Sequence, residues 1–220
     1  KQVMCLDLPG HGLSASIAPY TLEAVVDGVY AQLPEQACVL VGWSLGGNVA
    51  LRLAEKYPQK IKSLVLIASN PHFIETKNWP GVKADILQLF TNNLQKTPAP
   101  TLLRFMSLQV QGMDNMKDVL KKIKTSMQMS PDPESAALDA GLDILQTADM
   151  RAALKSFTFP TQLILGEQDG LVPVAIGSEC QILQPKLECH IIKQAGHMPF
   201  MTHEAAVVQL VHRFIQRAAE

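Results

Sequence analysis

Residues 37–47 read Ala-Cys-Val-Leu-Val-Gly-Trp-Ser-Leu-Gly-Gly and carry the pattern that decides the fold. Residues 37–41 are a continuous apolar run of strand length, and residues 46–57 have helical spacing that stops before Pro58. Between these two segments lies a G-x-S-x-G motif at residues 42–46. A serine in this motif, between a strand and a helix, predicts a sharp turn that lifts the Ser44 hydroxyl above the sheet.

Strands and helices alternate on both sides of this turn. We expect further strands at residues 3–7, 61–68, 161–165 and 187–193, and further helices at residues 21–33, 174–183 and 204–219. Thr21 is the expected N-cap of the first helix. Apolar strands that alternate with amphipathic helices predict an α/β fold, with a mostly parallel sheet and helices on both faces.

Residues 70–156 interrupt the alternation. They contain helical stretches broken by prolines, no strand pattern, and six of the nine methionines. We therefore expect a first part of the core at residues 1–69, a helical cap at residues 70–156 and a second part of the core at residues 157–220. The methionines suggest either an apolar slot for an aliphatic chain or the ordinary core of a helical unit.

A serine hydroxyl becomes a good nucleophile only beside a general base that a third group orients. In this type of fold the order along the chain is serine, acid, histidine. Asp169 and His197 each follow a predicted strand, so both are expected on loops at the carboxyl edge of the sheet. We predict a catalytic triad of Ser44, Asp169 and His197, with Glu167 as the alternative acid.

Charge and hydropathy exclude several classes of function. The chain has 19 basic and 20 acidic residues, which argues against a nucleic-acid partner bound through bulk charge. No apolar run reaches bilayer length and the first residues lack a signal-peptide pattern, so we expect a cytoplasmic protein without membrane contact.

The spacing of the cysteines and the absence of binding motifs from the sequence indicate the compartment and the need for cofactors. The four cysteines form no C-x-x-C pair and sit in apolar stretches, which favours buried free thiols in a reducing compartment. The sequence contains no cluster with metal-ligand spacing, no dinucleotide-binding glycine motif and no P-loop. We therefore expect neither a metal nor a cofactor.

At these residues the sequence resembles the α/β-hydrolase family. Residues 7–14, D-L-P-G-H-G-L-S, are similar to the turn after the family's fourth strand, residues 42–47 to its nucleophile turn, and residues 195–197 to its histidine loop. The resemblance implies that the N–H of Leu45 contributes to an oxyanion hole. The family's first strands, and a loop with a second oxyanion donor, precede the point where this sequence begins. We therefore expect it to be part of a larger domain.

Within the family, several segments are similar to carboxylesterases of biotin synthesis, which act on the methyl ester of pimeloyl-acyl-carrier protein. They are W-P-G at residues 79–81, R-F-M-S-L-Q at 104–109, G-L-D-I-L at 141–145, D-G-L-V-P at 169–173 and H-M-P-F at 197–200. The resemblance implies the same reaction without a cofactor, an acyl carrier protein as partner and a monomeric enzyme. It also implies substrate contacts from Ser44, Leu45, Phe105, Met106, Ser107, Leu108, Gln109 and His197.

A basic stretch in the expected cap suggests where such a partner docks. Residues 101–128 carry five basic and two acidic side chains, and the spacing of Lys117, Lys121 and Lys124 places them on one helix face. Arg104, Lys117 and Lys121 are candidate docking residues for an acidic carrier protein. The alternative is an ordinary solvated helix face.

Other functions remain open from the sequence. A general carboxylesterase, a thioesterase or a carbon–carbon bond hydrolase would use the same triad. A ligand-binding relative would keep the fold without the reaction. An epoxide hydrolase or haloalkane dehalogenase would need an aspartate where this chain has Ser44, which argues against both.

Overall fold

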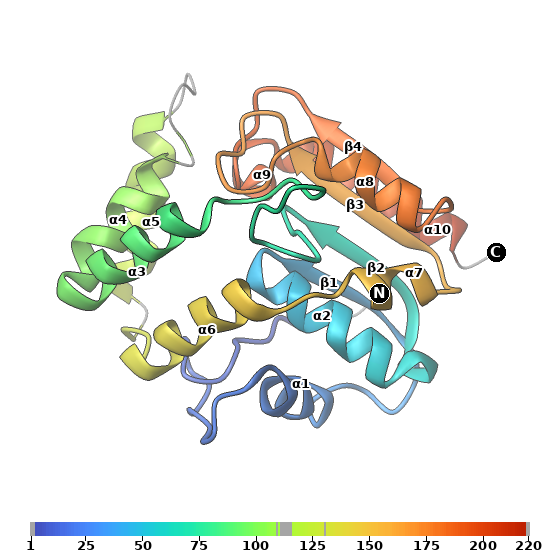
Figure 1. Cartoon of the computed structure of the whole chain (residues 1–220), viewed down its shortest axis with the longest axis horizontal. Coiled ribbons are helices and arrows are strands. Elements are labelled where there is room, and N and C mark those ends of the chain that lie inside the picture. The colour runs from blue at the N-terminus through green and yellow to red at the C-terminus, as the bar shows by residue number, and fades with distance from the viewer. Residues whose placement is uncertain (1–2, 109, 111–115, 130, 219–220) are drawn as a thin grey trace.

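The computed structural model describes residues 3–108, 110, 116–129 and 131–218. Its centre is a parallel sheet in the order β1-β2-β3-β4, formed by β1 (Cys38–Trp43), β2 (Ile61–Ile67), β3 (Thr161–Gly166) and β4 (Glu188–Ile192). Figure 1 shows the four strands side by side among the helices. Because all four run in one direction, the loops that follow them meet at one edge of the sheet.

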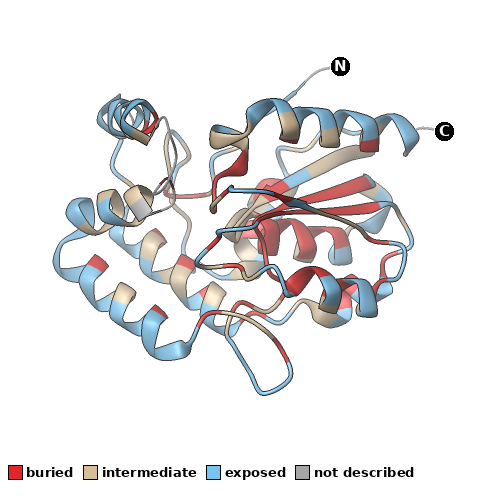
Figure 2. Cartoon of the chain, turned by 90° about the horizontal axis from the view of Figure 1, so that it is seen from above, coloured by how far each residue is buried: buried red, intermediate tan, exposed pale blue. Residues whose placement is uncertain are grey.

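Helices cover both faces of the sheet, as the sequence predicts. On one face lie α1 (Leu22–Tyr30), α2 (Leu45–Lys56), α7 (Arg151–Ser156) and α8 (Ile176–Leu183), and on the other lies α10 (Glu204–Arg217). In β2, Leu64 and Leu66 join the first core, and Val65 and Ile67 join the second, because successive side chains point to opposite faces. Figure 2 shows the buried strands edge-on between these helices.

A group of helices fills the stretch between β2 and β3. It consists of α3 (Ala84–Lys96), α4 (Pro98–Leu108), α5 (Met116–Met129) and α6 (Ser135–Thr147). α3 packs against α4 and α6, while α4 packs against α5, and Figure 1 shows α3, α4 and α5 to one side of the sheet. α7, at the end of the stretch, packs against α2 and α8 of the sheet layer instead. The cap boundaries at residues 70 and 156 stay a prediction.

Two short helices complete the order of elements. A 3₁₀ turn, η1 (Pro58–Lys60), connects α2 to β2, and α9 (Pro199–Thr202) follows the loop after β4. At α1 the predicted cap is present, because the Thr21 hydroxyl oxygen accepts the Ala24 N–H at 3.2 Å. α1 ends at Tyr30, three residues before the end that its apolar spacing predicts.

The strand predicted at residues 3–7 is wrong. Residues 3–8 have no assigned secondary structure, and Val3 and Met4 are exposed. A strand forms only where a neighbouring backbone pairs with it, and none of the described strands lies beside this segment. For the same reason Cys5 is exposed, against the prediction of a buried thiol, whereas Cys180 is buried.

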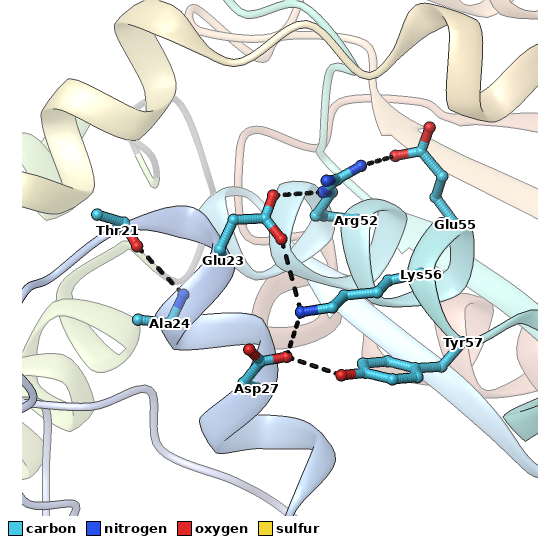
Figure 3. Close-up of polar contacts among 8 residues, drawn as sticks. All are labelled: Thr21, Glu23, Ala24, Asp27, Arg52, Glu55, Lys56 and Tyr57. Atoms are coloured by element: carbon cyan, nitrogen blue, oxygen red, sulfur yellow. Dashed lines mark hydrogen bonds and ion pairs between the residues drawn. The ribbon is translucent and has the colours of Figure 1, made fainter.

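A charged network joins α1 to α2 on their solvent side, as Figure 3 shows. Arg52 donates to Glu23 at 2.6 Å, and Lys56 donates to Oδ1 of Asp27, also at 2.6 Å. The Tyr57 hydroxyl donates to the same Asp27 oxygen at 2.8 Å. The hydrogen bonds from Lys56 and Tyr57 hold the pKa of the Asp27 carboxyl below its ordinary value. The network fixes the end of α2 that lies opposite the G-x-S-x-G turn.

Replacing Asp27 by Asn tests this network, because the change keeps the side-chain shape and removes the charge. The pKa of Asp27 is lowered in the folded protein, so the ionised carboxylate stabilises the folded state at pH values above the unfolded-state pKa. This contribution to the free energy of unfolding is lost as the pH falls through the folded-state pKa. We expect a slightly lower melting temperature for Asp27→Asn at neutral pH, because exposed ion pairs contribute little, and a smaller difference in acid.

Thermal melts followed by circular dichroism, from neutral pH down to about pH 3, measure this difference. Glu75→Gln is the matched control, since Glu75 is an exposed carboxylate on the loop between β2 and α3. A gap between Asp27→Asn and wild type that stays constant at every pH would contradict a role for the Asp27 charge.

Candidate active site

The turn between β1 and α2 holds Ser44 in a backbone conformation that L-residues rarely adopt. Its φ is 51° and its ψ is −121°, a strain of roughly 1–3 kcal/mol. The Ser44 N–H donates to the Ile67 carbonyl at 3.1 Å. The Ser44 carbonyl in turn accepts the Gly47 N–H at 2.9 Å and the Ser69 hydroxyl at 3.1 Å. β2 and the residues after it therefore hold the strained turn in place.

Glycines make this turn sterically possible. A Cβ atom on Gly42 would lie 2.5 Å from the carbonyl oxygen of Gly46 and 2.7 Å from the Cα atom of Gly47. A Cβ atom on Gly47 would collide with the side chain of Ser69. A Cβ atom on Gly46 would meet no atom within 4 Å. The close approach of strand and helix thus requires Gly42 and Gly47, and leaves Gly46 free to vary.

His197 connects the two other predicted residues. Its Nδ1 atom donates to Oδ2 of Asp169 at 2.8 Å, which leaves Nε2 to accept the Ser44 hydroxyl at 2.9 Å. The side chains of His197 and Asp169 are 1% and 0% exposed. A carboxylate on Nδ1 holds the imidazole in the tautomer in which Nε2 acts as a general base. The three side chains therefore form a Ser-His-Asp triad.

The backbone orients Asp169 for this role. Its Oδ1 atom accepts the N–H of Leu171 at 2.8 Å and the N–H of Val172 at 3.0 Å. With Oδ1 occupied in this way, Oδ2 is left for His197. The two backbone N–H groups therefore fix the orientation of the Asp169 side chain, which a residue that holds the imidazole in place requires.

Glu167, the alternative acid, has a different position. Its Oε1 atom accepts from Lys193 at 2.6 Å, and its Oε2 atom accepts the N–H of Gln194 at 3.0 Å. These contacts, the one from Lys193 foremost, hold the pKa of Glu167 below its ordinary value. Gln194 itself has a φ of 58°. Glu167 thus ties the start of the histidine loop, at a strained residue, and takes no part in the triad.

Leu45 is the first residue of α2 and follows Ser44 directly. The N–H groups in the first turn of a helix lack intrahelical partners, and the helix dipole favours negative charge there. The N–H of Leu45 is therefore well placed to stabilise an oxyanion formed at Ser44. Its role as an oxyanion-hole donor stays a prediction.

A cavity of about 540 Å³ opens beside Ser44, between the sheet edge and helices α3, α4 and α6. Its wall is apolar except for His11, Ser44 and Gln168. The apolar side chains include Phe90, Leu94, Phe105, Leu138, Leu142 and Leu145. No methionine is among the described side chains of this wall, which favours packing between helices as the role of the methionines.

Among the expected substrate contacts on α4, Phe105 lines the cavity. Its ring lies 5.3 Å from the ring of Phe90 on α3 and 6.3 Å from the ring of His197, measured between centroids. The geometry therefore brings Phe105 into the same space as the triad.

The other expected substrate contacts of α4 lie elsewhere or are not described. Met106 packs into an apolar cluster with α5, and the Ser107 hydroxyl donates to the Leu103 carbonyl at 2.7 Å. Leu108 ends α4, but its side chain, like the whole of Gln109, lies outside the described residues. A helix can direct only one face to the cavity, and in α4 that face includes Leu102 and Phe105.

Several cavity residues were not predicted from the sequence. Ile86, Phe90 and Leu94 line the cavity from α3, and their spacing of four residues is a signal that indicates one helix face. His11 lines the cavity from the turn after residue 8, and its Nδ1 atom donates to the Pro9 carbonyl at 3.0 Å. His11, which the sequence places in a turn, therefore lies at the same cavity as Ser44.

The candidate docking residues lie on the outer surface of the helix group. Lys117, Lys121 and Lys124 are exposed and line one shallow groove along α5. Arg104 is exposed on α4. The three lysines therefore share a helix face, as their spacing predicts.

The described part of the chain contains no group of three or more His, Cys, Asp or Glu side chains that could hold a metal ion. Within the same residues, no helix combines the length and the apolar character that crossing a membrane requires.

The family model described as alpha/beta hydrolase fold matches residues 1–204. The chain belongs to the α/β-hydrolase fold family.

The similar curated proteins include two pimeloyl-[acyl-carrier protein] methyl ester esterases. The one from Methylococcus capsulatus is 38% identical over 214 residues, which cover 97% of this chain and 84% of that protein. The one from Aliivibrio salmonicida is 36% identical over 215 residues, which cover 98% of this chain and 82% of that protein.

Solved structures show the same fold. An esterase from Exiguobacterium antarcticum superimposes with a TM-score of 0.85 at 17% identity, and a bromoperoxidase from Bacillus anthracis with 0.82 at 20% identity. Each match covers 96% of this chain and 80% of the other. The α/β-hydrolase architecture predicted from the sequence is thereby confirmed.

Two alanine substitutions test the steric argument at the nucleophile turn. Gly42→Ala forces a Cβ atom against backbone, and such overpacking typically costs about 1–3 kcal/mol or more. Gly46→Ala meets open space inside α2 and removes a helix glycine, which typically gains up to about 1 kcal/mol. Urea unfolding of the two variants and the wild type measures the difference. Equal stability of Gly42→Ala and Gly46→Ala would contradict the close approach.

Proposed function

We propose that the chain is a serine carboxylesterase that hydrolyses the methyl ester of pimeloyl-acyl-carrier protein through an acyl-enzyme on Ser44. The observation that carries this proposal is the hydrogen-bonded chain from Ser44 through His197 to Asp169, beside an apolar cavity. Relatives at 36–38% identity that act on this ester support the choice of substrate.

The geometry accounts for the first half of the reaction. Nε2 of His197 takes the hydroxyl proton as Oγ of Ser44 attacks the ester carbonyl, and Asp169 stabilises the imidazolium. The former carbonyl oxygen becomes an oxyanion near the N–H of Leu45. His197 then returns its proton to the departing methoxide, which leaves as methanol.

The second half uses the same groups. A water molecule loses a proton to Nε2 of His197 and attacks the acyl carbonyl on Ser44. The tetrahedral intermediate collapses, the bond to Oγ breaks, and His197 returns the proton to Ser44. The products are a free carboxylic acid and the enzyme in its starting state.

The cavity is suited to the acyl chain of such a substrate. Its volume of about 540 Å³ lies within the usual range for small-ligand sites, and its apolar wall favours an aliphatic chain. Phe105, with its ring near His197, would contact the acyl chain close to the ester. A cytoplasmic location is part of the same proposal, and the resemblance to esterases with a carrier-bound substrate supports it.

Ser44→Ala tests the nucleophile. We expect the hydrolysis of a short-chain p-nitrophenyl ester to fall by at least roughly 10³-fold, because the substitution removes the hydroxyl that is hydrogen-bonded to His197. Ser178→Ala is the matched control, since Ser178 is exposed on α8 and only caps a turn through the Ala175 carbonyl. A fluorophosphonate probe should label the wild type and Ser178→Ala but not Ser44→Ala. Retained turnover in Ser44→Ala would contradict the triad.

The lysine face of α5 is proposed as the surface that meets the carrier protein. Lys117, Lys121 and Lys124 present positive charge along one groove, and the exposed Arg104 lies on the neighbouring helix α4. Charges at the rim of an interface mainly raise the rate of encounter with a partner of opposite charge. An acidic carrier protein would therefore gain in association rate at this face.

Charge reversal separates docking from chemistry. We expect Lys117→Glu/Lys121→Glu to lower kcat/KM for the carrier-bound ester by roughly 10-fold, and less at high salt, since screening weakens exposed charges. Turnover of a free methyl ester should stay within about twofold, because surface charges leave the triad intact. The matched control is Lys62→Glu/Lys186→Glu, since both lysines are exposed at the amino ends of β2 and β4.

Two outcomes would count against these proposals separately. An equal loss of activity on the carrier-bound and the free ester would contradict docking at α5. A wild-type preference for free short-chain esters over the carrier-bound ester would contradict the proposed substrate and favour a general carboxylesterase.

A further inference from the structure

We propose that Trp43 is a positioning residue for catalysis, whose indole N–H holds the backbone of His197 against the nucleophile turn. This inference rests on the proposed esterase reaction, and it concerns a residue that would act through His197. Trp43 is the last residue of β1 and directly precedes Ser44.

Besides the bond within the triad, a second hydrogen bond joins the end of β1 to the histidine loop. Nε1 of Trp43 donates to the carbonyl oxygen of His197 at 2.8 Å, across 154 positions of sequence. Ser44 lies one residue from the donor, and the acceptor belongs to His197 itself. The bond therefore acts on the separation that matters for proton transfer, the 2.9 Å between Oγ of Ser44 and Nε2 of His197.

Aromatic packing fixes the direction of the indole. The Trp43 ring meets the Phe200 ring edge-on, with centroids 5.3 Å apart and planes at 78°. It also lies 5.6 Å from the His197 ring, at 52°. Edge-to-face and tilted contacts at these distances are favourable for aromatic rings. The indole is therefore held between α9 and the histidine, with its N–H directed at one carbonyl.

The position of His197 depends on contacts that fix the backbone of the histidine loop, residues 193–198. The loop leaves the edge strand β4 through Gln194, whose φ is 58°. Glu167 accepts the Gln194 N–H, and the Gln168 N–H donates to the Ala195 carbonyl at 2.8 Å, so these contacts hold the loop before it reaches His197.

The His197 ring is held by two hydrogen bonds, one from Nδ1 to Oδ2 of Asp169 and one from the Ser44 hydroxyl to Nε2. Both of these involve the ring, whereas the hydrogen bond from the Trp43 indole acts on the His197 backbone. Misplacement by about 1 Å can cost roughly 10²-fold in rate.

Trp43→Phe removes the indole N–H and keeps an aromatic ring beside Phe200. We expect kcat for a p-nitrophenyl ester to fall by roughly 10-fold, with KM within about twofold, because proton transfer is impaired while the acyl site is intact. Because an unfolded fraction would also lower the apparent kcat at unchanged KM, kcat is calculated per active site titrated with the fluorophosphonate probe. Wild-type kcat in Trp43→Phe would overturn the proposal.

The second tryptophan provides a matched control. The Trp79 indole N–H is also a buried donor, to Oδ1 of Asn70 at 2.9 Å and to the His72 carbonyl at 3.0 Å. Trp79→Phe therefore removes the same kind of hydrogen bond away from the histidine loop. We expect it to lower the melting temperature while kcat remains near the wild-type value. An equal fall of kcat in both variants would overturn the specific role of Trp43.

Proton NMR tests the positioning role of Trp43 without a measurement of ester hydrolysis. The proton on Nδ1 of His197, shared with Asp169, should give a far-downfield signal in the proton NMR spectrum. We expect this signal to shift or broaden in Trp43→Phe and to persist in Trp79→Phe. An unchanged signal in Trp43→Phe would overturn the proposal, even if the wild type showed no ester hydrolysis and the proposed function failed.

Phe200→Leu keeps the inference testable if Trp43→Phe does not fold. This variant keeps the indole donor and removes the ring contact that directs it. We expect a smaller fall in kcat, of roughly threefold, at unchanged KM, since the hydrogen bond is weakened and not removed. Wild-type kcat together with a wild-type downfield signal in Phe200→Leu would contradict the positioning role.

Discussion

The positive φ of Ser44 is the constraint on which the rest of the site depends. The conformation is unfavourable by itself and persists only because β1, β2 and α2 fix the residues on both sides of it. Gly42 and Gly47 let the strand and the helix approach closely enough to form the turn. The strain has a chemical result, since it presents the hydroxyl to His197 and leaves the first N–H of α2 beside it.

A parallel sheet converts this local turn into a catalytic site. Ser44 and His197 are 153 positions apart and Asp169 precedes His197 by 28, yet all three follow strands whose carboxyl ends share one edge. The loops lie close together because the parallel strands end at the same edge of the sheet, so no direct interaction between the loops is needed to bring them there. What remains is fine adjustment, which backbone N–H groups supply for Asp169 and the Trp43 indole supplies for His197.

Features encoded locally could be predicted from the sequence, and features encoded by pairing could not. The apolar runs of β1 to β4 and the turn motif at Ser44 are local, and so are the acid and the histidine that follow strands. Residues 3–6 are also apolar, but a strand needs a neighbouring strand to pair with, and a local sequence pattern does not show whether one is present. The same limit applies to α4, where Phe105 faces the cavity and Met106 faces α5, because packing against other helices decides which face turns inward.

The triad and most of the cavity wall come from different parts of the fold. The triad residues follow strands of the sheet. The turn at Ser44 tolerates little substitution, because a Cβ atom on Gly42 would collide with the backbone of Gly46 and Gly47. The cavity wall comes mainly from α3, α4 and α6, where one apolar side chain can replace another at modest cost. An esterase and a bromoperoxidase share the architecture at 17–20% identity, so the fold is compatible with change at most positions. The turn that holds the strained serine is constrained by backbone contacts, whereas the helices that line the cavity can exchange side chains without altering that turn.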